Sequence, residues 1–179
     1  MSFTDNSLDP VGEPYRRQMT SYRRTRSAIL EASRNLVAIH GLHVTSMIEI
    51  ADTAEVSRAT LYNHFRSKES VMRGLLEFEV GRILGLAAKE PSPDHALARI
   101  SIEISADPAL AALRVFDPAL LTQLLSAGAH PLWQQIHEGL VELLHSEQKA
   151  ALALRWLLGQ VFAPLTPEQS AQQAGVLTA

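Results

Sequence analysis

The chain has 179 residues, 46% of them apolar, which is enough to bury the core of one sizeable domain or two small ones. It contains no cysteine, and this excludes disulfide bonds and thiolate metal sites. The N-terminus has no apolar signal core, and the longest apolar stretch, residues 150–165, is interrupted by Arg155, Gln160 and Pro164. We therefore expect a cytoplasmic protein with no membrane partner.

The net charge of -3 conceals two halves of opposite sign. Residues 15–68 contain nine Arg or Lys against four Asp or Glu, a balance of +5, whereas residues 74–179 contain six against eleven, a balance of -5. A basic N-terminal half on an acidic remainder favours contact between that half and a polyanion. Two ordinary solvated surfaces would give the same balance, so charge alone does not decide.

Every persuasive segment has helical periodicity, and we predict an all-α protein of about ten helices. The first long helix is expected to begin near Thr20 or Ser21 and to end at Gly41, where a left-handed C-cap fits. Its predicted apolar stripe consists of Ile29, Leu30, Ala32, Leu36, Val37 and Ile39.

Residues 45–68 predict two short helices joined by a tight turn, a helix-turn-helix. Ser46 and Glu49 have the spacing of a capping box at the start of the first, and Ser57 caps the second. The residues expected to face the core are Ile50, Ala51, Leu61 and Phe65.

The second of these helices carries groups that bond bases and phosphates. Arg58 can make a bidentate contact with guanine, and Asn63 can bond adenine if it faces the groove. Thr60 offers a hydroxyl to a base edge or a methyl to thymine. Tyr62 and His64 suit phosphate oxygens or a thymine methyl, although either side chain alone could instead pack against the head.

Phosphate contacts are also predicted at helix N-termini. Lys68 adds a cation to the start of the fourth helix, and Thr45 or Ser46 would place the start of the second against the DNA backbone. An arm at residues 1–19, with a basic end, precedes the first helix and is expected to be flexible. Its arginines, together with Arg23 and Arg24, either contact DNA or form a solvated basic helix start.

Ser67 caps a fourth helix that is expected to reach about Ala88. Gly74, Gly81 and Gly85 share one face of this helix. We interpret them as a surface for close helix packing more than as a source of flexibility that would let the head tilt. Four pairs of a capping residue and a proline predict helix starts near residues 93, 108, 118 and 167. Two longer helices are expected at about 131–145 and 147–163.

The N-terminal third resembles the head of the tetracycline-repressor (TetR) family. The matching residues are His40, Gly41, Leu42, Thr45, Ser46, Ile50, Ala51, Val56, Ser57, Thr60, Leu61, Tyr62, His64, Phe65, Ser67, Lys68 and Glu69. The resemblance covers about residues 23–80. The family commonly has Gly in the turn, where this chain has Glu55, and a polar residue where it has Ile48.

The resemblance implies a homodimeric DNA-binding regulator, with a helix-turn-helix head at residues 20–67 and a body at 68–179 whose first helix, 68–88, connects the two. Two heads would read a near-palindromic operator in double-stranded DNA. The body would dimerise through its last two long helices and bind an unidentified small-molecule effector. In the simplest case the protein is a repressor, and the effector releases it from the operator. No cofactor and no metal are expected. The DNA-contacting positions that carry over are Thr45, Ser57, Arg58, Thr60, Tyr62, His64 and Lys68.

Within the body, two sets of residues are candidates for binding. The candidates for an apolar ligand pocket are Phe116, Trp133, His137 and Trp156, although ordinary core is the commoner role for each of them. The candidates for the dimer interface are Leu140, Leu144, Leu152, Trp156, Gly159 and Phe162.

Two other classes of function remain open. Glu142 and His145 have the Glu-x-x-His spacing of metal sites in helical bundles, but such a site needs a second motif and two more glutamates. The other class is a helical partner-binding module without DNA affinity.

Overall fold

The computed structural model describes residues 12–126 and 131–179, and it is helical throughout those ranges apart from short connections. Its ten helices are α1 (Gly12–His40), α2 (Met47–Thr53), α3 (Arg58–His64), α4 (Lys68–Ala87), α5 (Pro93–Ala106), α6 (Pro108–Phe116), α7 (Pro118–Ser126), α8 (Pro131–Leu144), α9 (Glu147–Phe162) and α10 (Pro167–Thr178). The predicted all-α fold of about ten helices is confirmed. No helix in the described ranges is long and apolar enough to cross a membrane.

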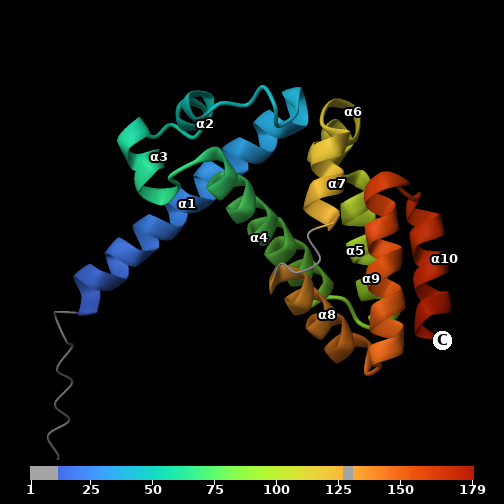
Figure 1. Ribbon diagram of the computed structural model, residues 1–179. Coiled ribbons are helices and arrows are strands. Elements are labelled where there is room, and N and C mark those ends of the chain that lie inside the picture. The colour runs from blue at the N-terminus through green and yellow to red at the C-terminus, as the bar shows by residue number, and fades with distance from the viewer. Residues whose placement is uncertain (1–11, 127–130) are drawn as a thin grey trace, which may run out of the picture.

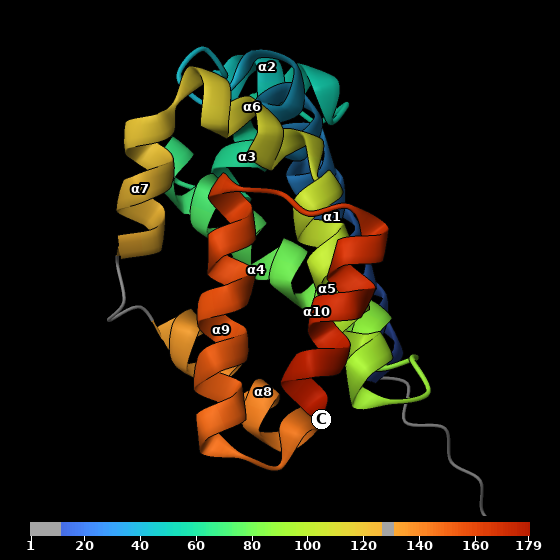
Figure 2. The same ribbon diagram turned by 90° about the vertical axis from the view of Figure 1, so that its right-hand side faces the viewer.

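The helices form a head and a body that meet along α1, α4 and α6. Figure 1 shows α2 and α3 packed beside α1 at one end, while α4 leaves the head and runs into the body formed by α5–α10. The rotated view in Figure 2 shows α9 and α10 together on the side of the body opposite to the head's outer end.

The head has a closed apolar core. Its buried members are Ile29, Leu30, Leu36, Ile50, Ala51, Leu61, Phe65, Val71 and Leu75. Gly74 permits the close approach of α4 to this core, because a Cβ there would lie 2.7 Å from Cε1 of Phe65. Packing therefore explains Gly74, but the prediction is wrong for Gly81 and Gly85, around which a Cβ would meet no atom within 4 Å.

Helix α1 begins at Gly12, well before the predicted start near Thr20 or Ser21. Thr20 does not cap the helix, because its hydroxyl donates to the carbonyl of Arg16, one turn earlier, at 2.8 Å. Residues 12–19 of the expected flexible arm are thus helical, and residues 1–11 lie outside the described residues. At the other end of α1, Ile39 is 65% exposed and does not belong to the core, contrary to the prediction.

Helix α6 is attached to α1 and the following loop at both of its ends. Before α6, Asp107 accepts a hydrogen bond from Nη2 of Arg34 at 2.7 Å. After α6, Oδ2 of the buried Asp117 accepts the backbone N–H groups of Leu42 at 2.7 Å and His43 at 3.2 Å. Gly41 has φ +79° and lies so close to Asp117 that a Cβ would be 2.8 Å from Oδ2. These contacts make α6 the element of the body most directly tied to the head.

The body closes around a second apolar core. Its buried residues are Ala87, Ala96, Leu97, Ile100, Leu140, Leu144, Ala150, Ala153, Leu157 and Ala174. The predicted capping residue–proline pairs do begin α5, α6, α7 and α10. Prolines at these positions supply a helical φ without wasting a backbone donor.

Candidate nucleic-acid interface

Side-chain caps fix where α2 and α3 begin. Oγ of Ser46 accepts the N–H of Glu49 at 3.2 Å, while the Ser46 N–H donates to Oε2 of Glu49 at 2.9 Å, which completes the predicted capping box. The hydrogen bonds from Ser46 lower the pKa of Glu49 below its ordinary value. Oγ of Ser57 accepts the N–H of Thr60 at 3.0 Å and caps α3.

The turn between these helices depends on a left-handed residue. Glu55, which stands where the TetR family commonly has Gly, has φ 54°, and its N–H donates to the carbonyl of Asp52 at 3.2 Å. The next N–H, of Val56, donates to the carbonyl of Ala51 at 3.0 Å. A non-glycine residue in this region costs about 1–2 kcal/mol. The two backbone hydrogen bonds of the turn offset part of this cost.

One side of α3 faces the core and the opposite side is open. Leu61 is fully buried, whereas Arg58, Tyr62 and Asn63 are exposed, with 50% of Tyr62 accessible. The α3 face, as we name the surface of Arg58, Tyr62 and Asn63, thus presents a guanidinium, a phenol and an amide on adjacent turns. These groups pair with guanine, phosphate and adenine.

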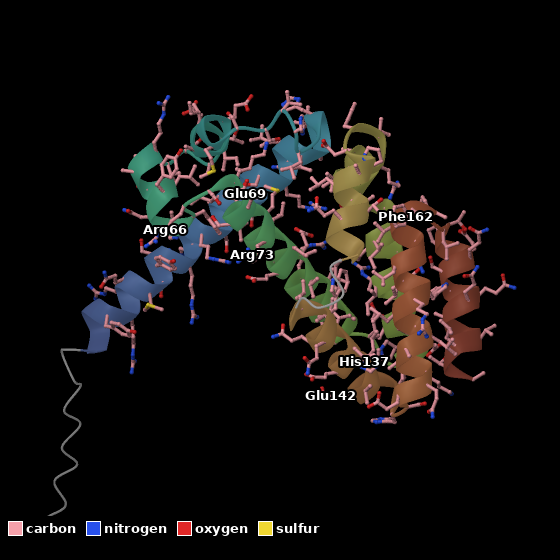
Figure 3. All side chains as sticks on the ribbon, in the orientation of Figure 1. Arg66, Glu69, Arg73, His137, Glu142 and Phe162 are labelled. Carbon is pink, nitrogen blue, oxygen red and sulfur yellow. The ribbon has the colours of Figure 1, made fainter. Side chains whose placement is uncertain are left out.

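Two further exposed residues of the head, Arg66 and Ile48, were not among the predicted contact residues. Arg66 follows α3 directly and is exposed; Figure 3 shows it near the start of α4, where Glu69 and Arg73 also lie. Its place between His64 and Lys68, two predicted contact residues, could have drawn attention to it. Ile48 on α2 is 46% exposed and offers an apolar surface beside the turn.

Thr45 is a correction to the predicted set. It is 1% exposed, and its hydroxyl donates to the carbonyl of Gly41 at 2.8 Å. Its hydroxyl therefore supports the loop from within and is not presented to a duplex. Ser46, the neighbouring cap, is half-buried at the start of α2.

Three of the other predicted groups are already bonded within the protein. The hydroxyls of Ser57 and Thr60 lie 2.8 Å apart, and Nζ of Lys68 donates to the carbonyl of His43 at 3.1 Å. Lys68 therefore ties the start of α4 to the loop after α1. Each group would reach a phosphate by sharing or exchanging its present bond.

His64 packs against α1 more than the other polar residues of α3. Its ring lies 4.2 Å from the ring of Tyr22, and its Nδ1 is buried without a hydrogen-bond partner. Burial lowers the pKa of His64, and the nearby charge of Arg26 lowers it further. The imidazole is therefore neutral near pH 7 and carries one proton. If that proton is on Nε2, this nitrogen can donate a hydrogen bond.

The N-terminal half of α1 extends a basic surface beyond the head. Residues 15–24 are all exposed, including Arg16, Arg17, Arg23 and Arg24. Figure 1 shows this part of α1 reaching past α3 and clear of the body. The predicted basic segment is therefore a helix that projects from the head.

A cavity of about 210 Å³ lies inside the body, between α4, α5, α6 and the helices that follow. Of the four predicted pocket residues, only Trp133 lines it. Phe116 is 58% exposed at the end of α6, so its assignment to a cavity wall is wrong.

The other two predicted pocket residues also lie outside the cavity wall. Nε2 of His137 is 3.7 Å from Oε2 of Glu147, and Nε1 of Trp156 donates to Oε1 of Gln173 at 2.6 Å. Both side chains therefore make polar contacts between helices of the body.

The predicted dimer residues divide into two groups. Leu140 and Leu144 are buried inside the protomer, so they cannot form a dimer interface, and their assignment is wrong. Leu152 and Phe162 are 55% and 51% exposed on α9, and Gly159 between them has open space around it. Helical periodicity identified an apolar face of α8 but not the neighbour that covers it.

The metal-site alternative gains no geometric support. Glu142 and His145 are exposed, and His145 takes a left-handed φ of 50° just after α8 ends. No group of three or more His, Cys, Asp or Glu side chains in residues 12–126 and 131–179 is arranged to hold a metal ion.

The fold and the site define an all-helical helix-turn-helix protein, and comparison with known proteins shows which proteins it resembles. The model of the TetR family of bacterial regulatory proteins matches residues 29–75. The HTH-type transcriptional regulator UidR of Escherichia coli is 37% identical over 57 residues, or 32% of this chain and 29% of UidR. The regulator RutR of Escherichia coli is 29% identical over 150 residues, or 80% of this chain and 66% of RutR.

The likeness extends beyond the head in three dimensions. The solved structure of the dihydroxyacetone kinase operon activator DhaS superimposes with a TM-score of 0.62 at 16% identity, covering 86% of this chain and 93% of DhaS. Residues 29–75 thus match the TetR family, and the fold of the chain resembles that of DhaS. The chain spans less than a third of the length of UidR.

Proposed function

We propose that this protein is a dimeric, sequence-specific transcriptional regulator that binds operator DNA in the cytoplasm and has no catalytic activity. The observation that carries the proposal is the α3 face. It presents Arg58, Tyr62 and Asn63 outward on a helix whose other side, at Leu61 and Phe65, is locked into the head core. A major groove accepts one α-helix and is read by such side chains.

Base and phosphate contacts divide within the interface. Arg58 and Asn63 would read base edges, while Tyr62, Arg66 and Lys68 would hold the phosphate backbone. The Lys68 ammonium lies in the first turn of the 20-residue helix α4, whose N-terminus also attracts phosphate. Phosphate contacts fix the register and orientation of the protein on DNA, whereas base contacts select the sequence.

The projecting half of α1 would add a sequence-independent contact. Its exposed arginines lie on the same domain as the α3 face, at Arg16, Arg17, Arg23 and Arg24. Each Lys or Arg on a phosphate releases about one counterion, so the double variant Arg23→Ala/Arg24→Ala should reduce the salt slope of DNA binding by about one to two. An unchanged slope and affinity would contradict this role for α1.

The exposed face of α9 would form the dimer interface together with α10. Leu152 and Phe162 are exposed apolar residues on one side of α9, Gly159 leaves room for a neighbouring helix, and Val176 on α10 is 76% exposed. Figure 3 places Phe162 at the end of α9, beside the start of α10. Two such helix pairs would bury these residues in a four-helix bundle.

Sedimentation equilibrium tests this interface. Leu152→Glu should convert the dimer to monomers, because an unpaired carboxylate would be buried at the interface. Val115→Glu is the matched control, since Val115 on α6 is also exposed (72%) but lies on another face. Dimers that survive Leu152→Glu would place the interface elsewhere.

An effector in the body cavity would act on the heads through α6 and α4. The cavity is lined by residues of both helices, and α6 holds α1 and its loop through Asp107 and Asp117. A ligand that favours one spacing of the heads would change operator affinity by coupling. We propose that the free dimer is a repressor and that the effector lowers its operator affinity.

Selection of bound duplexes from random DNA tests the function as a whole. The full-length protein should enrich a near-palindromic sequence with two half-sites, as a symmetric dimer requires. Failure to enrich any sequence at low salt would exclude the regulator and favour a partner-binding module. A reporter placed behind the selected operator then gives the sign of regulation.

A further inference from the structure

The body cavity has a wall that is apolar except at one end. Its apolar side chains include Leu76, Val80, Ile83, Ile104, Leu110 and Leu158. Arg34 of α1, Glu79 of α4 and Asp107 before α6 are the charged residues that the described chain contributes to the wall. A ligand in this cavity is therefore surrounded by hydrocarbon and meets charge at one pole, which includes helix α1 of the head.

That pole belongs to an ion-pair chain with no excess charge. Nη2 of Arg34 binds Asp107 at 2.7 Å, and its Nε lies 3.3 Å from Oε1 of Glu79. Arg82 then binds Glu79 at 2.8 Å and Glu103 at 2.8 Å. Arg99 completes the chain at 2.9 Å from Glu103. Three arginines thus face three carboxylates, so an ionic ligand group would find no uncompensated counter-charge in this chain and would lose its hydration.

Two atoms at the pole still lack a hydrogen bond. Nε of Arg34 and Oε1 of Glu79 are buried, and although they are 3.3 Å apart as an ion pair, neither makes a hydrogen bond. One is a donor and the other an acceptor. A hydroxyl is the small group that satisfies both at once, because it accepts from the guanidinium and donates to the carboxylate. A carboxylate would repel Glu79 and Asp107, and an ammonium would have no acceptor for Arg34.

We propose that the cavity binds an uncharged alcohol or phenol with an apolar body, whose hydroxyl inserts between Nε of Arg34 and Oε1 of Glu79. A cavity of about 210 Å³ suits about eight to twelve non-hydrogen atoms, by comparison with the ~150 Å³ cavity that holds benzene. The inference deepens the proposed function, since this ligand is the effector. Insertion would separate α1 from α4 at the joint between head and body.

The test compares four eight-carbon probes on the full-length protein without DNA: 1-octanol, octanoate, octylammonium and octane. The fluorescence of Trp133, which lines the cavity, reports binding. The chain has two tryptophans, so the measurement uses the Trp156→Phe variant, in which Trp133 is the only one left. We expect 1-octanol to bind at least tenfold more tightly than each of the other three. Equal or tighter binding of any other probe, or no binding of the series, overturns the proposal.

Charge and volume variants locate the site. Glu79→Gln removes the acceptor carboxylate, so the preference for 1-octanol over octanoate should fall by at least tenfold. Glu77→Gln, on the same helix but 48% exposed and away from the cavity wall, should leave the preference unchanged. Val80→Phe fills the cavity without changing a charge and should abolish 1-octanol binding. An unaltered preference in Glu79→Gln, or unaltered 1-octanol binding in Val80→Phe, overturns the assignment.

DNA binding is measured separately, so the two proposals fail separately. If 1-octanol binds as expected and no duplex is selected, the proposed ligand site is supported and the proposed DNA-binding function is contradicted. If a palindrome is selected and none of the four probes binds, the regulator stands and the ligand class is overturned.

Discussion

The head and the body are both helical, but their cores differ in what they leave open. The head packs Ile29, Leu61 and Phe65 into a closed cluster and places its polar groups outside. The body encloses a cavity of about 210 Å³ and keeps a chain of charges at one end of it. A closed core holds the α3 face rigid, whereas a core with a cavity can change when it is filled. This difference fits a head of fixed shape joined to a body whose shape can change when a ligand fills its cavity.

The largest expected effect is a difference in the free energy of unfolding between two leucine truncations, one in each region. Leu61→Ala in the closed head core should lower the free energy of unfolding by about 2–5 kcal/mol, because it creates a new cavity. Leu110→Ala on the cavity wall should cost about 1 kcal/mol, since Leu110 is only half-buried. Urea unfolding of both variants checks the difference. Equal losses would show that the two cores are equally tight.

The next test breaks the link between the two regions. Asp117→Ala leaves the buried N–H of Leu42 without its acceptor, at a cost of about 1–3 kcal/mol. Hydrogen exchange should then lose protection at the backbone amides of Leu42 and His43. Asp94→Ala removes an equally charged but more exposed group in the body and should leave these amides protected. Retained protection in Asp117→Ala would show that the carboxylate does not fasten the head.

A third test sharpens the division of labour within the head. Arg58→Ala should reduce affinity for the selected operator by about 1–3 kcal/mol and relax base preference at one position. Tyr62→Ala should weaken binding to specific and nonspecific DNA alike, because phosphate contacts carry no sequence information. Competition binding against randomised half-sites measures both effects. Uniform weakening by Arg58→Ala would assign that residue to the backbone.

The smallest expected effect is a pH dependence in the head. Burial lowers the pKa of His64 in the folded state, so between that value and the ordinary value near 6.5 the unfolded chain binds more protons. The free energy of unfolding should therefore fall as pH decreases below about 6.5, and the His64→Asn variant should lose part of this slope. His145→Asn, at an exposed histidine, should keep the slope of the parent protein. Identical slopes in all three proteins would contradict the buried, neutral imidazole.

The two regions also differ in how far the sequence predicts them. Caps and the capping residue–proline pairs act within a few residues, so helix starts and the helix-turn-helix follow from local chemistry. Tertiary contacts decided the rest. Thr45 has the right hydroxyl but faces inward, and Leu140 lies on an apolar face that the protomer itself covers. Gln160 interrupts an apolar stretch in the sequence, yet it is 2% exposed and accepts a hydrogen bond from Ser101.

The attachment of α6 at both ends limits how heads can be exchanged between related proteins. A chimaera joined near residue 67 would set a foreign α1 and loop against the original α6, and it would break up the partners of Asp107 and Asp117 unless the donor also had Arg34 and Gly41. A graft that transfers residues 107–117 with the head would keep these bonds together. Exchange of the head of this protein therefore requires cutting the chain at three points instead of one.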